Sequence, residues 1–357
     1  MQAIQGQVMN RRSAEEGRPF GRPLRSRQGR AVRYSPNEKT GFIRRLGANT
    51  TCLLLLAVFI LGTWTQPALA NTPNTKATEK QFAKEELKPL MTALEEVGFS
   101  RESLERVFYD SRLKKIDRVV GINALNPDSP NIYAQFTEPY AIHIAHKFLR
   151  RNLSALKSVE EQYGVPKEII VGILLVETQF GRAHLPYRVL DVFTTLAVEA
   201  HPSAINRHYQ RLKGIDPRVK KDWLTERLIK KAEFAFTELV AIMAMHRENL
   251  SRLFHVRGSY AGAIGIPQFL PSSYILFAVD GNGDGKRDLN QLPDALASVG
   301  NYLASHGWTE EAHFDDLWRS VWSYNRSENY VRAIFEVAFK LQKPLSKRAY
   351  RPRKPKA

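Results

Sequence analysis

The sequence has almost no cysteine: Cys52 is the only one among 357 residues, and it lies in an apolar run near the amino terminus. A disulfide framework is therefore excluded. The nine histidines show no metal-ligand spacing, which leaves a zinc enzyme without support. No arrangement of serine, histidine and carboxylate typical of a nucleophilic hydrolase stands out either.

Acidic residues are scarce relative to basic ones, with 36 Asp and Glu against 53 Lys and Arg and a formal net charge of +17. Part of this excess lies in residues 1–41, which are rich in Arg, Gly, Ser and Pro and show no periodic apolar pattern. This composition is typical of a disordered extension. The chain stays basic without it, so we expect a polyanionic partner such as a cell-wall polymer or a membrane surface.

The apolar run from Cys52 to Trp64 is short for a bilayer span. It follows two arginines, at positions 44–45, and precedes Ala68-Leu69-Ala70. A basic segment, an apolar segment and an A-x-A site are typical of a secretory signal peptide, which we assign to residues 42–70, with cleavage after Ala70. We therefore predict export to the periplasm, which argues against nucleic acid as a partner. An uncleaved membrane anchor is the alternative.

Strand signals are few and short beyond the signal region. Apolar residues instead recur at helical spacing through residues 80–342, so we predict one mainly helical domain there. A polar linker, 71–79, precedes this domain, and a basic disordered tail, 343–357, follows it. Any membrane contact is expected only through the amino terminus or this tail. The expected helical segments are 80–110 in two parts, 140–163, 166–181, 189–198, 223–250, 295–306 and 327–341.

The most informative stretch is 166–181, in which Pro166 suits a first helical turn and Gly181 suits a helix end. Residues 169–176 are apolar or glycine on every face, which is typical of a helix enclosed by other elements. Glu177 follows directly, and apolar neighbours should raise the pKa of its carboxyl, as a general acid working near neutral pH requires. On this helix alone, a Glu177 that turns to solvent is equally consistent.

A glycine-rich motif runs from Gly258 to Tyr274, and its glycines let the backbone approach a ligand closely. Turn formation and packing are the alternative role for these residues. Another motif, near the carboxyl end of the domain, is Tyr324-Asn325-Arg326-Ser327-Glu328-Asn329-Tyr330. Aromatic faces suit sugar rings, although tyrosines on a helical stretch more often belong to the core.

Between these two motifs lies a loop with the spacing of a calcium site. Asp280, Asn282 and Asp284 occupy positions 1, 3 and 5, and Gly285 suits the sharp turn at position 6. Lys286 at position 7 would offer only its backbone carbonyl. The usual bidentate glutamate at position 12 is missing, so a loop that only turns the chain is the alternative.

Taken together, the four motifs resemble the membrane-bound lytic murein transglycosylase B family over roughly residues 85–340. The long glycine-rich motif makes the resemblance distinctive. It implies a lysozyme-like α+β fold, mainly helical, with a small EF-hand-like calcium-loop subdomain. We expect a monomer acting on peptidoglycan glycan strands, with cell-wall synthesis proteins as further partners.

The resemblance assigns the catalytic carboxyl to Glu177 and implies cleavage of the β-1,4 bond between N-acetylmuramic acid and N-acetylglucosamine. Glu177 would protonate the leaving oxygen, while the 2-acetamido group of the substrate stabilises the anomeric carbon. The carboxylate would then take the proton of the C6 hydroxyl, leaving a 1,6-anhydro end without consuming water. This substrate-assisted route departs from the two-carboxylate scheme. Asp191 and Glu199 are candidates for a second carboxylate, and the resemblance implies that they are structural or surface groups.

Five residues match substrate-contact positions of that family: Ser259, Gln268, Tyr324, Asn325 and Tyr330. A structural calcium ion is implied at Asp280, Asn282, Asp284, Lys286 and a following aspartate, Asp294. A hydrolysing muramidase, which would need a positioned water and usually a second carboxylate, is one alternative function. A non-catalytic peptidoglycan-binding scaffold and a calcium-dependent structural protein are others.

Overall fold

The structure is a computed structural model, and it describes residues 80–125 and 130–342. These residues belong to one compact unit. The predicted extension, signal peptide, linker and tail lie outside the described residues, as do residues 126–129 of a loop.

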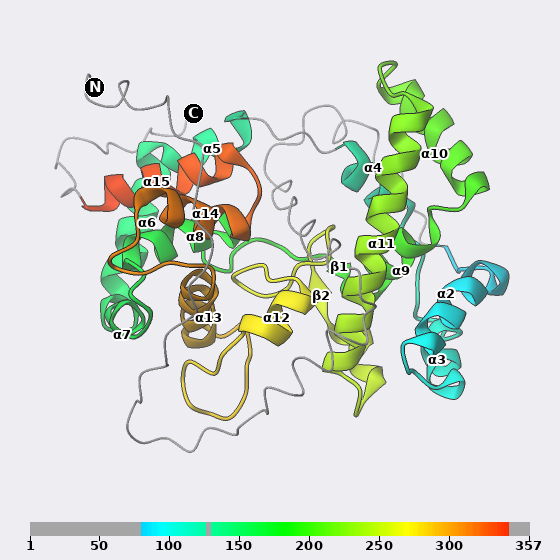
Figure 1. The fold of residues 1–357 in the computed structure, drawn as a ribbon, viewed down its shortest axis with the longest axis horizontal. Coiled ribbons are helices and arrows are strands. Elements are labelled where there is room, and N and C mark those ends of the chain that lie inside the picture. Colours follow the sequence, from blue (N-terminus) through cyan, green and yellow to red (C-terminus); the bar gives the residue numbers. More distant parts are fainter. Residues whose placement is uncertain (1–79, 126–129, 343–357) are drawn as a thin grey trace, which may run out of the picture. The chain divides into compact units, whose positions relative to one another are not determined.

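The described chain is mainly helical, which confirms the predicted fold class (Figure 1). The helices are α2 Lys84–Glu96, α3 Arg101–Phe108, α4 Asp117–Leu125, α5 Pro130–Thr137, α6 Pro139–Arg151, α7 Leu153–Tyr163, α8 Lys167–Thr178, α9 Val189–Val198, α10 Pro202–Ile215, α11 Lys221–Met245, the 3-10 helix η2 Leu250–His255, α12 Pro271–Phe277, α13 Leu292–Ser305, α14 Phe314–Tyr324 and α15 Glu328–Gln342. Within residues 80–125 and 130–342, no helix has the length and apolar character that a bilayer crossing requires.

One short antiparallel ribbon accompanies the helices. Strand β1, Tyr187–Arg188, pairs with β2, Arg257–Gly258, so that Tyr187 faces Gly258 across the ribbon. Isolated bridges continue this pairing within the glycine-rich motif, where Ile264 pairs with both Gly258 and Phe269. The motif is therefore a folded loop, attached at its start to the segment that precedes α9.

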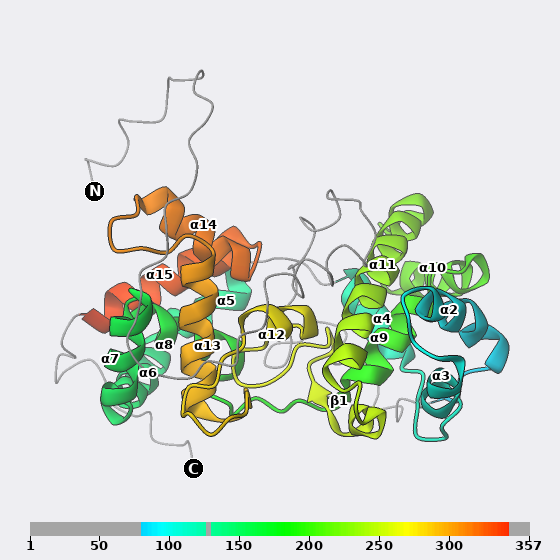
Figure 2. The same cartoon turned by 60° about the horizontal axis from the view of Figure 1, so that its bottom comes forward.

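Helix α8 lies at the centre of a helical cluster formed by α5, α6, α7, α13 and α15. Both views place α8 among these helices (Figures 1 and 2). Its side chains from Glu168 to Thr178 are all buried, which confirms the prediction of an enclosed helix. This burial applies to the two polar residues at its carboxyl end as well as to the apolar run.

Helix α9 packs along the much longer α11, and both contact α4. The bounds of α9 are those expected from its apolar positions, and Ser100 caps α3 by accepting from the Ser103 amide, as its place before an apolar stripe predicts. The single helix expected over 140–163 is instead two, α6 and α7. Asn152 separates them with a non-helical φ of −114°.

Candidate active site

A tight turn ends the central helix. The helix stops at Thr178, three residues before the expected end, because Gln179, Phe180 and Gly181 all adopt left-handed backbone with φ of 48°, 66° and 84°. Two consecutive non-glycine residues in this region carry strain that the surroundings must hold. The Phe180 ring stacks on Phe148 with centroids 3.9 Å apart, which fixes one side of the turn.

The hydroxyl of Thr178 fixes the other side. It accepts a hydrogen bond from the Gly181 amide at 2.9 Å and donates one to the Ile266 carbonyl at 2.7 Å. Ile266 belongs to the glycine-rich loop, so one side chain joins the end of α8 to that loop. The turn and the loop also line a cavity of about 290 Å³, whose wall consists of Thr178, Phe180, Gly181, Ala183, Leu185, Gly265, Ile266 and Asn290.

Glu177 does not turn to solvent, since it is only 4% exposed. Its Oε1 accepts a hydrogen bond from the Tyr330 hydroxyl at 2.8 Å, while its buried Oε2 has no hydrogen-bond partner among the described residues. Burial raises the pKa of Glu177 to about 8, and the Tyr330 bond opposes this rise only in part. This raised pKa favours the protonated carboxyl at neutral pH.

Two of the residues predicted to contact the substrate, Tyr324 and Tyr330, are buried near Glu177. Tyr330 is fully buried, and its ring lies 6.5 Å from the nearly parallel ring of Tyr324. Burial and the neighbouring Glu177 carboxyl hold the pKa of both tyrosines well above the ordinary value, so both keep their protons. The Tyr324 hydroxyl donates a hydrogen bond to the Pro267 carbonyl at 2.5 Å, and this bond connects α14 to the glycine-rich loop.

The remaining predicted contact residues have different environments. Gln268 is buried with a left-handed φ of 53°, and its amide donates to the Gly265 carbonyl at 2.9 Å. Asn325 is also buried, and its Oδ1 has no hydrogen-bond partner within the described residues. The Ser259 hydroxyl accepts hydrogen bonds from the Ala261 and Ala263 amides, which belong to its own turn. The structure thus joins Glu177 directly to Tyr330, whose ring stacks on that of Tyr324, whereas the Ser259 hydroxyl bonds only within its own turn.

Asp191, a candidate second carboxylate, is structural. It is buried, and its Oδ1 accepts from the Lys114 amide at 3.1 Å while its Oδ2 accepts from the Arg188 guanidinium at 2.8 Å. Both oxygens are therefore engaged away from Glu177.

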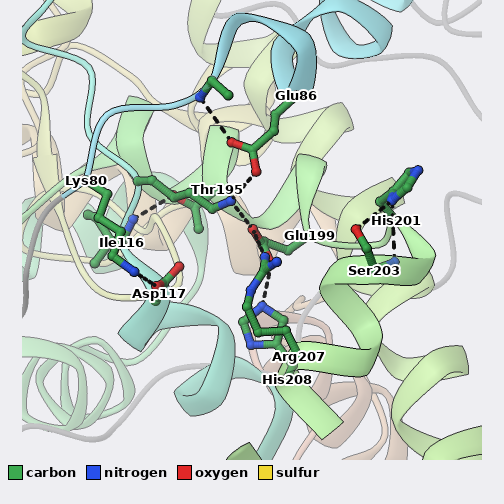
Figure 3. Close-up of polar contacts among 12 residues, drawn as sticks. Lys80, Glu86, Ile116, Asp117, Thr195, Glu199, His201, Ser203, Arg207 and His208 are labelled. Carbon is green, nitrogen blue, oxygen red and sulfur yellow. Dashed lines mark hydrogen bonds and ion pairs between the residues drawn. The ribbon is translucent and has the colours of Figure 1, made fainter. Parts of the chain in front are cut away.

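Glu199, the other candidate, is 1% exposed and lies among cations (Figure 3). Lys115 approaches its carboxylate at 2.6 Å, Arg207 at 2.9 Å, and His208 donates through Nε2. Lys115 also pairs with Glu86 of α2 at 2.7 Å. Burial alone would raise the pKa of Glu199, but the hydrogen bonds from His208 and Lys115 and their charges lower it to about 2. This permanently charged group is unsuited to proton transfer.

The candidate calcium loop is organised around Asp280. Its Oδ1 accepts from the amides of Gly283 and Asp284 at 2.6 and 3.2 Å, and its Oδ2 accepts from Gly285 at 2.7 Å. Burial would raise the pKa of Asp280, yet these backbone amides lower it. Gly283 and Gly285 both have positive φ, as the predicted sharp turn requires.

Asp294 joins the two ends of this loop. The side chain is fully buried, and its oxygens accept from the Gly281 amide at 2.9 Å and the Asp288 amide at 2.7 Å. Carboxylate oxygens keep lone pairs beyond one such bond, so an all-oxygen set with Asn282 and Asp284 fits calcium chemically. Across 80–125 and 130–342, no three His, Cys, Asp or Glu side chains gather as a metal cluster, so a calcium ion here would also need the Asn282 amide oxygen and the Lys286 carbonyl.

The helical fold around this site is that of lytic transglycosylases of known structure. The Escherichia coli lytic transglycosylase Slt35, solved with calcium, superposes with a TM-score of 0.58 at 24% identity, over 76% of this chain and 97% of that one. SltB3 from Pseudomonas aeruginosa, solved with NAG-NAM-pentapeptide, gives 0.55 at 20% identity, over 72% and 79%.

The chain belongs to the family described as Transglycosylase SLT domain, which matches residues 82–316. It is also similar to the membrane-bound lytic murein transglycosylase B of Escherichia coli (strain K12), with 33% identity over 224 residues. That match covers 60% of this chain and 54% of the relative, so the chain spans about half the length of the curated relative it matches.

Proposed function

We propose that this protein is a peptidoglycan lytic transglycosylase in which Glu177 acts first as general acid and then as general base. One observation carries the proposal: Glu177 is a buried carboxyl with a raised pKa, and within residues 80–125 and 130–342 its Oε2 has no hydrogen-bond partner and no cation pairs with it. A general acid must hold its proton at the working pH, and this environment keeps it. Membership of the transglycosylase family supports the same reaction.

The reaction begins with the proton of Glu177 passing to the glycosidic oxygen as its bond to the anomeric carbon of N-acetylmuramic acid breaks. The 2-acetamido oxygen of the same sugar bonds to that carbon and takes the role of nucleophile that a second carboxylate has in other retaining glycosidases. The Glu177 carboxylate then takes the proton of the C6 hydroxyl, whose oxygen attacks the anomeric carbon and releases the acetamido group. Glu177 ends protonated, and the product carries a 1,6-anhydro ring.

The surrounding residues bind and position in this scheme. Tyr330 orients Oε1 of Glu177 and leaves Oε2 for the substrate. Asn325 offers a buried carbonyl oxygen without a partner in the described chain, which suits an acetamido N–H or a sugar hydroxyl. Gln268, Tyr324 and Ser259 complete the proposed contact set through the loop that Thr178 joins to α8.

The mass of the released muropeptides tests this function. Purified protein incubated with murein should release products that are lighter by one water than hydrolysis products, because the C6 hydroxyl replaces water as nucleophile. Reducing ends would identify a hydrolysing muramidase. Binding to murein without any cleavage would identify a non-catalytic scaffold.

We also propose that the loop from Asp280 holds a calcium ion, with Asn282, Asp284, the Lys286 carbonyl and Asp294 completing the set. The bound ion would neutralise the clustered carboxylates and stabilise the loop. The calcium complex of Slt35 supports this proposal.

The cellular setting is the last part of the proposal. A signal peptide over 42–70 directs the chain to the periplasm, with residues 80–342 as the catalytic domain of a monomer. Its partners are glycan strands and cell-wall synthesis proteins. Amino-terminal sequencing of the envelope form should begin at Asn71, and a mature chain that still contains Leu53 would favour an anchor instead.

A further inference from the structure

A second buried carboxyl, Glu238 in the interior of α11, has no role in the reaction scheme. It is fully buried, and it forms no ion pair with any residue of 80–125 or 130–342. Its two oxygens instead accept from one residue: Oε2 from the Ser272 amide at 2.9 Å, and Oε1 from the Ser272 hydroxyl at 2.7 Å. A buried carboxyl without a cation is costly, so this bidentate contact calls for an explanation.

The contact caps a helix from outside. Ser272 is the second residue of α12, and the amides of a first helical turn have no partner within their own helix. The residue before α12, Leu270, has no side chain that could accept from them. Glu238 supplies the acceptor from α11, so the beginning of α12 is fixed to the longest helix of the described chain.

This fixed point lies just after the loop segment that contains Gln268. Thr178 holds the Ile266 carbonyl and Tyr324 holds the Pro267 carbonyl, both on the earlier side. Between these anchors and Ser272, Gln268 keeps its strained left-handed backbone. Such a conformation persists only where the surroundings determine it from both sides.

We propose that Glu238 is a positioning residue for glycan binding: it fixes Ser272, and through it the loop segment that presents Gln268. The inference rests on the proposed function, in which Gln268 contacts the glycan. Glu238 itself touches no reacting atom. The proton-transfer group, Glu177, is held separately by α8 and by Tyr330 of α15. Loss of the Glu238 contact should therefore weaken glycan binding and leave turnover of bound substrate largely intact.

The test compares Glu238→Leu with Glu238→Gln. Leucine removes both acceptors, whereas glutamine can still accept from the Ser272 amide and can donate to its hydroxyl, which also accepts. The matched control is Glu233→Leu, an exposed carboxylate of the same helix. KM and kcat are measured on soluble murein glycan chains, and affinity for a chitin tetrasaccharide is measured by calorimetry in a Glu177→Gln background.

The expected result for Glu238→Leu is a rise in KM and a loss of affinity of about tenfold each, with kcat within about twofold of wild type. Glu238→Gln should restore most of the affinity, and Glu233→Leu should change neither quantity. A fall in kcat at unchanged KM, or a lower melting temperature with unchanged affinity, would overturn the positioning role.

The two arms separate this inference from the proposed function. A wild-type protein that cleaves no murein refutes the proposed reaction, while the calorimetric comparison still decides the role of Glu238. An active wild type whose affinity is the same in Glu238→Leu refutes the inference alone. If Glu238→Leu does not fold, Ser272→Ala takes its place, because it removes the hydroxyl contact with Glu238. A lower affinity in Ser272→Ala, beside near-wild-type affinity in Glu238→Gln, supports the positioning role, and wild-type affinity in Ser272→Ala contradicts it.

Discussion

Glu177 of α8 and Glu199, which directly follows α9, are almost equally buried, yet they have opposite electrostatic environments. Glu177 has one tyrosine hydroxyl beside it and a pKa raised by burial to about 8. Glu199 contacts Lys115, Arg207 and His208, and two of these groups, His208 and Lys115, overcome the effect of burial and lower its pKa to about 2. Burial alone therefore does not raise the pKa of a carboxyl; burial without a neighbouring cation does.

The two glutamates also differ in how many hydrogen-bond and ion-pair partners they have. Glu199 contacts Lys115 and two residues of α10, and Lys115 extends this network to Glu86 of α2. These contacts connect segments of the chain and keep Glu199 charged at neutral pH, so it has no proton to transfer. Glu177 makes one hydrogen bond within the described chain and keeps an oxygen free. That free oxygen is costly in the unliganded protein and is what a substrate can use.

The sharpest way to break the comparison is to remove the proton from Glu177. Glu177→Gln keeps the shape and cannot transfer a proton, so the cleavage rate should fall at or beyond the upper part of the range of about 10²–10⁴-fold for acid–base catalysis. Glu168→Gln, in the same helix and paired with Lys167, is the control and should stay within about twofold. Muropeptide release measured by chromatography checks both, and wild-type turnover in Glu177→Gln would mean that another residue is catalytic.

Removing Glu199 should affect stability rather than chemistry. Glu199→Leu leaves Lys115, Arg207 and His208 without their carboxylate, and such a broken buried pair costs about 3–5 kcal/mol. Denaturant unfolding at neutral pH measures this loss, and a change below about 1 kcal/mol would show that the network adds little.

The two groups should also give stability opposite pH dependences. Glu199, with its lowered pKa, contributes stability that is present above its ordinary value of 4.5 and is lost as the pH falls through about 2. Glu177, with its raised pKa, contributes stability that is complete below 4.5 and is lost as the pH rises through about 8. The melting temperature of Glu177→Gln should therefore rise relative to that of wild type as the pH increases from 4.5 to about 8. Parallel curves of melting temperature against pH for the two proteins would contradict the raised pKa.

A smaller effect is expected from the hydroxyl beside Glu177. Tyr330→Phe removes the one hydrogen bond that Glu177 accepts from the described residues, and this bond lowers its pKa. The pKa should therefore rise further, and the alkaline limb of the rate profile should move to higher pH. The rate at neutral pH should fall about tenfold, because Oε1 loses its orienting partner. Tyr163→Phe, which changes a half-buried tyrosine of α7, should alter neither quantity, and an unmoved pH profile in Tyr330→Phe would contradict the proposed orientation.

Calcium should give the smallest effect. An ion bound only by the folded state raises the melting temperature by roughly 2–4 °C for each kcal/mol of binding free energy. Asp280→Ala should abolish the rise, while Asp315→Ala, an exposed aspartate of α14, should keep it. A calcium response that survives in Asp280→Ala would place the ion elsewhere.

The sequence predicts those parts that depend on local spacing. The apolar run before Glu177 predicts an enclosed helix, and the structure buries every side chain from Glu168 to Thr178. The apolar positions of 189–198 predict α9 with its observed bounds. By contrast, α4, α5, α10 and α14 lie in segments where the sequence raised no helical expectation, since their helical form depends on packing against α9, α11, α13 and α15.

The electrostatic environment of the site could not be predicted in the same way. Glu177 and Tyr330 lie 153 positions apart, and Lys115 and Glu199 belong to different segments, so no periodicity connects them. The sequence predicts that Tyr324 and Tyr330 contact the glycan, and this stays a prediction. It does not predict that the Tyr330 hydroxyl bonds to Glu177 or that the Tyr324 hydroxyl bonds to the Pro267 carbonyl. The helix end at Thr178 was missed because the left-handed turn begins at Gln179, a residue type that seldom adopts it.

Site-specific titration of the glutamate carboxyls tests the central claim most directly. In protein labelled with ¹³C at the glutamate carboxyl, the resonance absent from Glu177→Gln should titrate near pH 8, and the resonance absent from Glu199→Gln should stay in its charged form down to about pH 2. A Glu177 resonance that titrates near the ordinary value of 4.5 would contradict the account, because the carboxyl would then have no proton to donate at neutral pH.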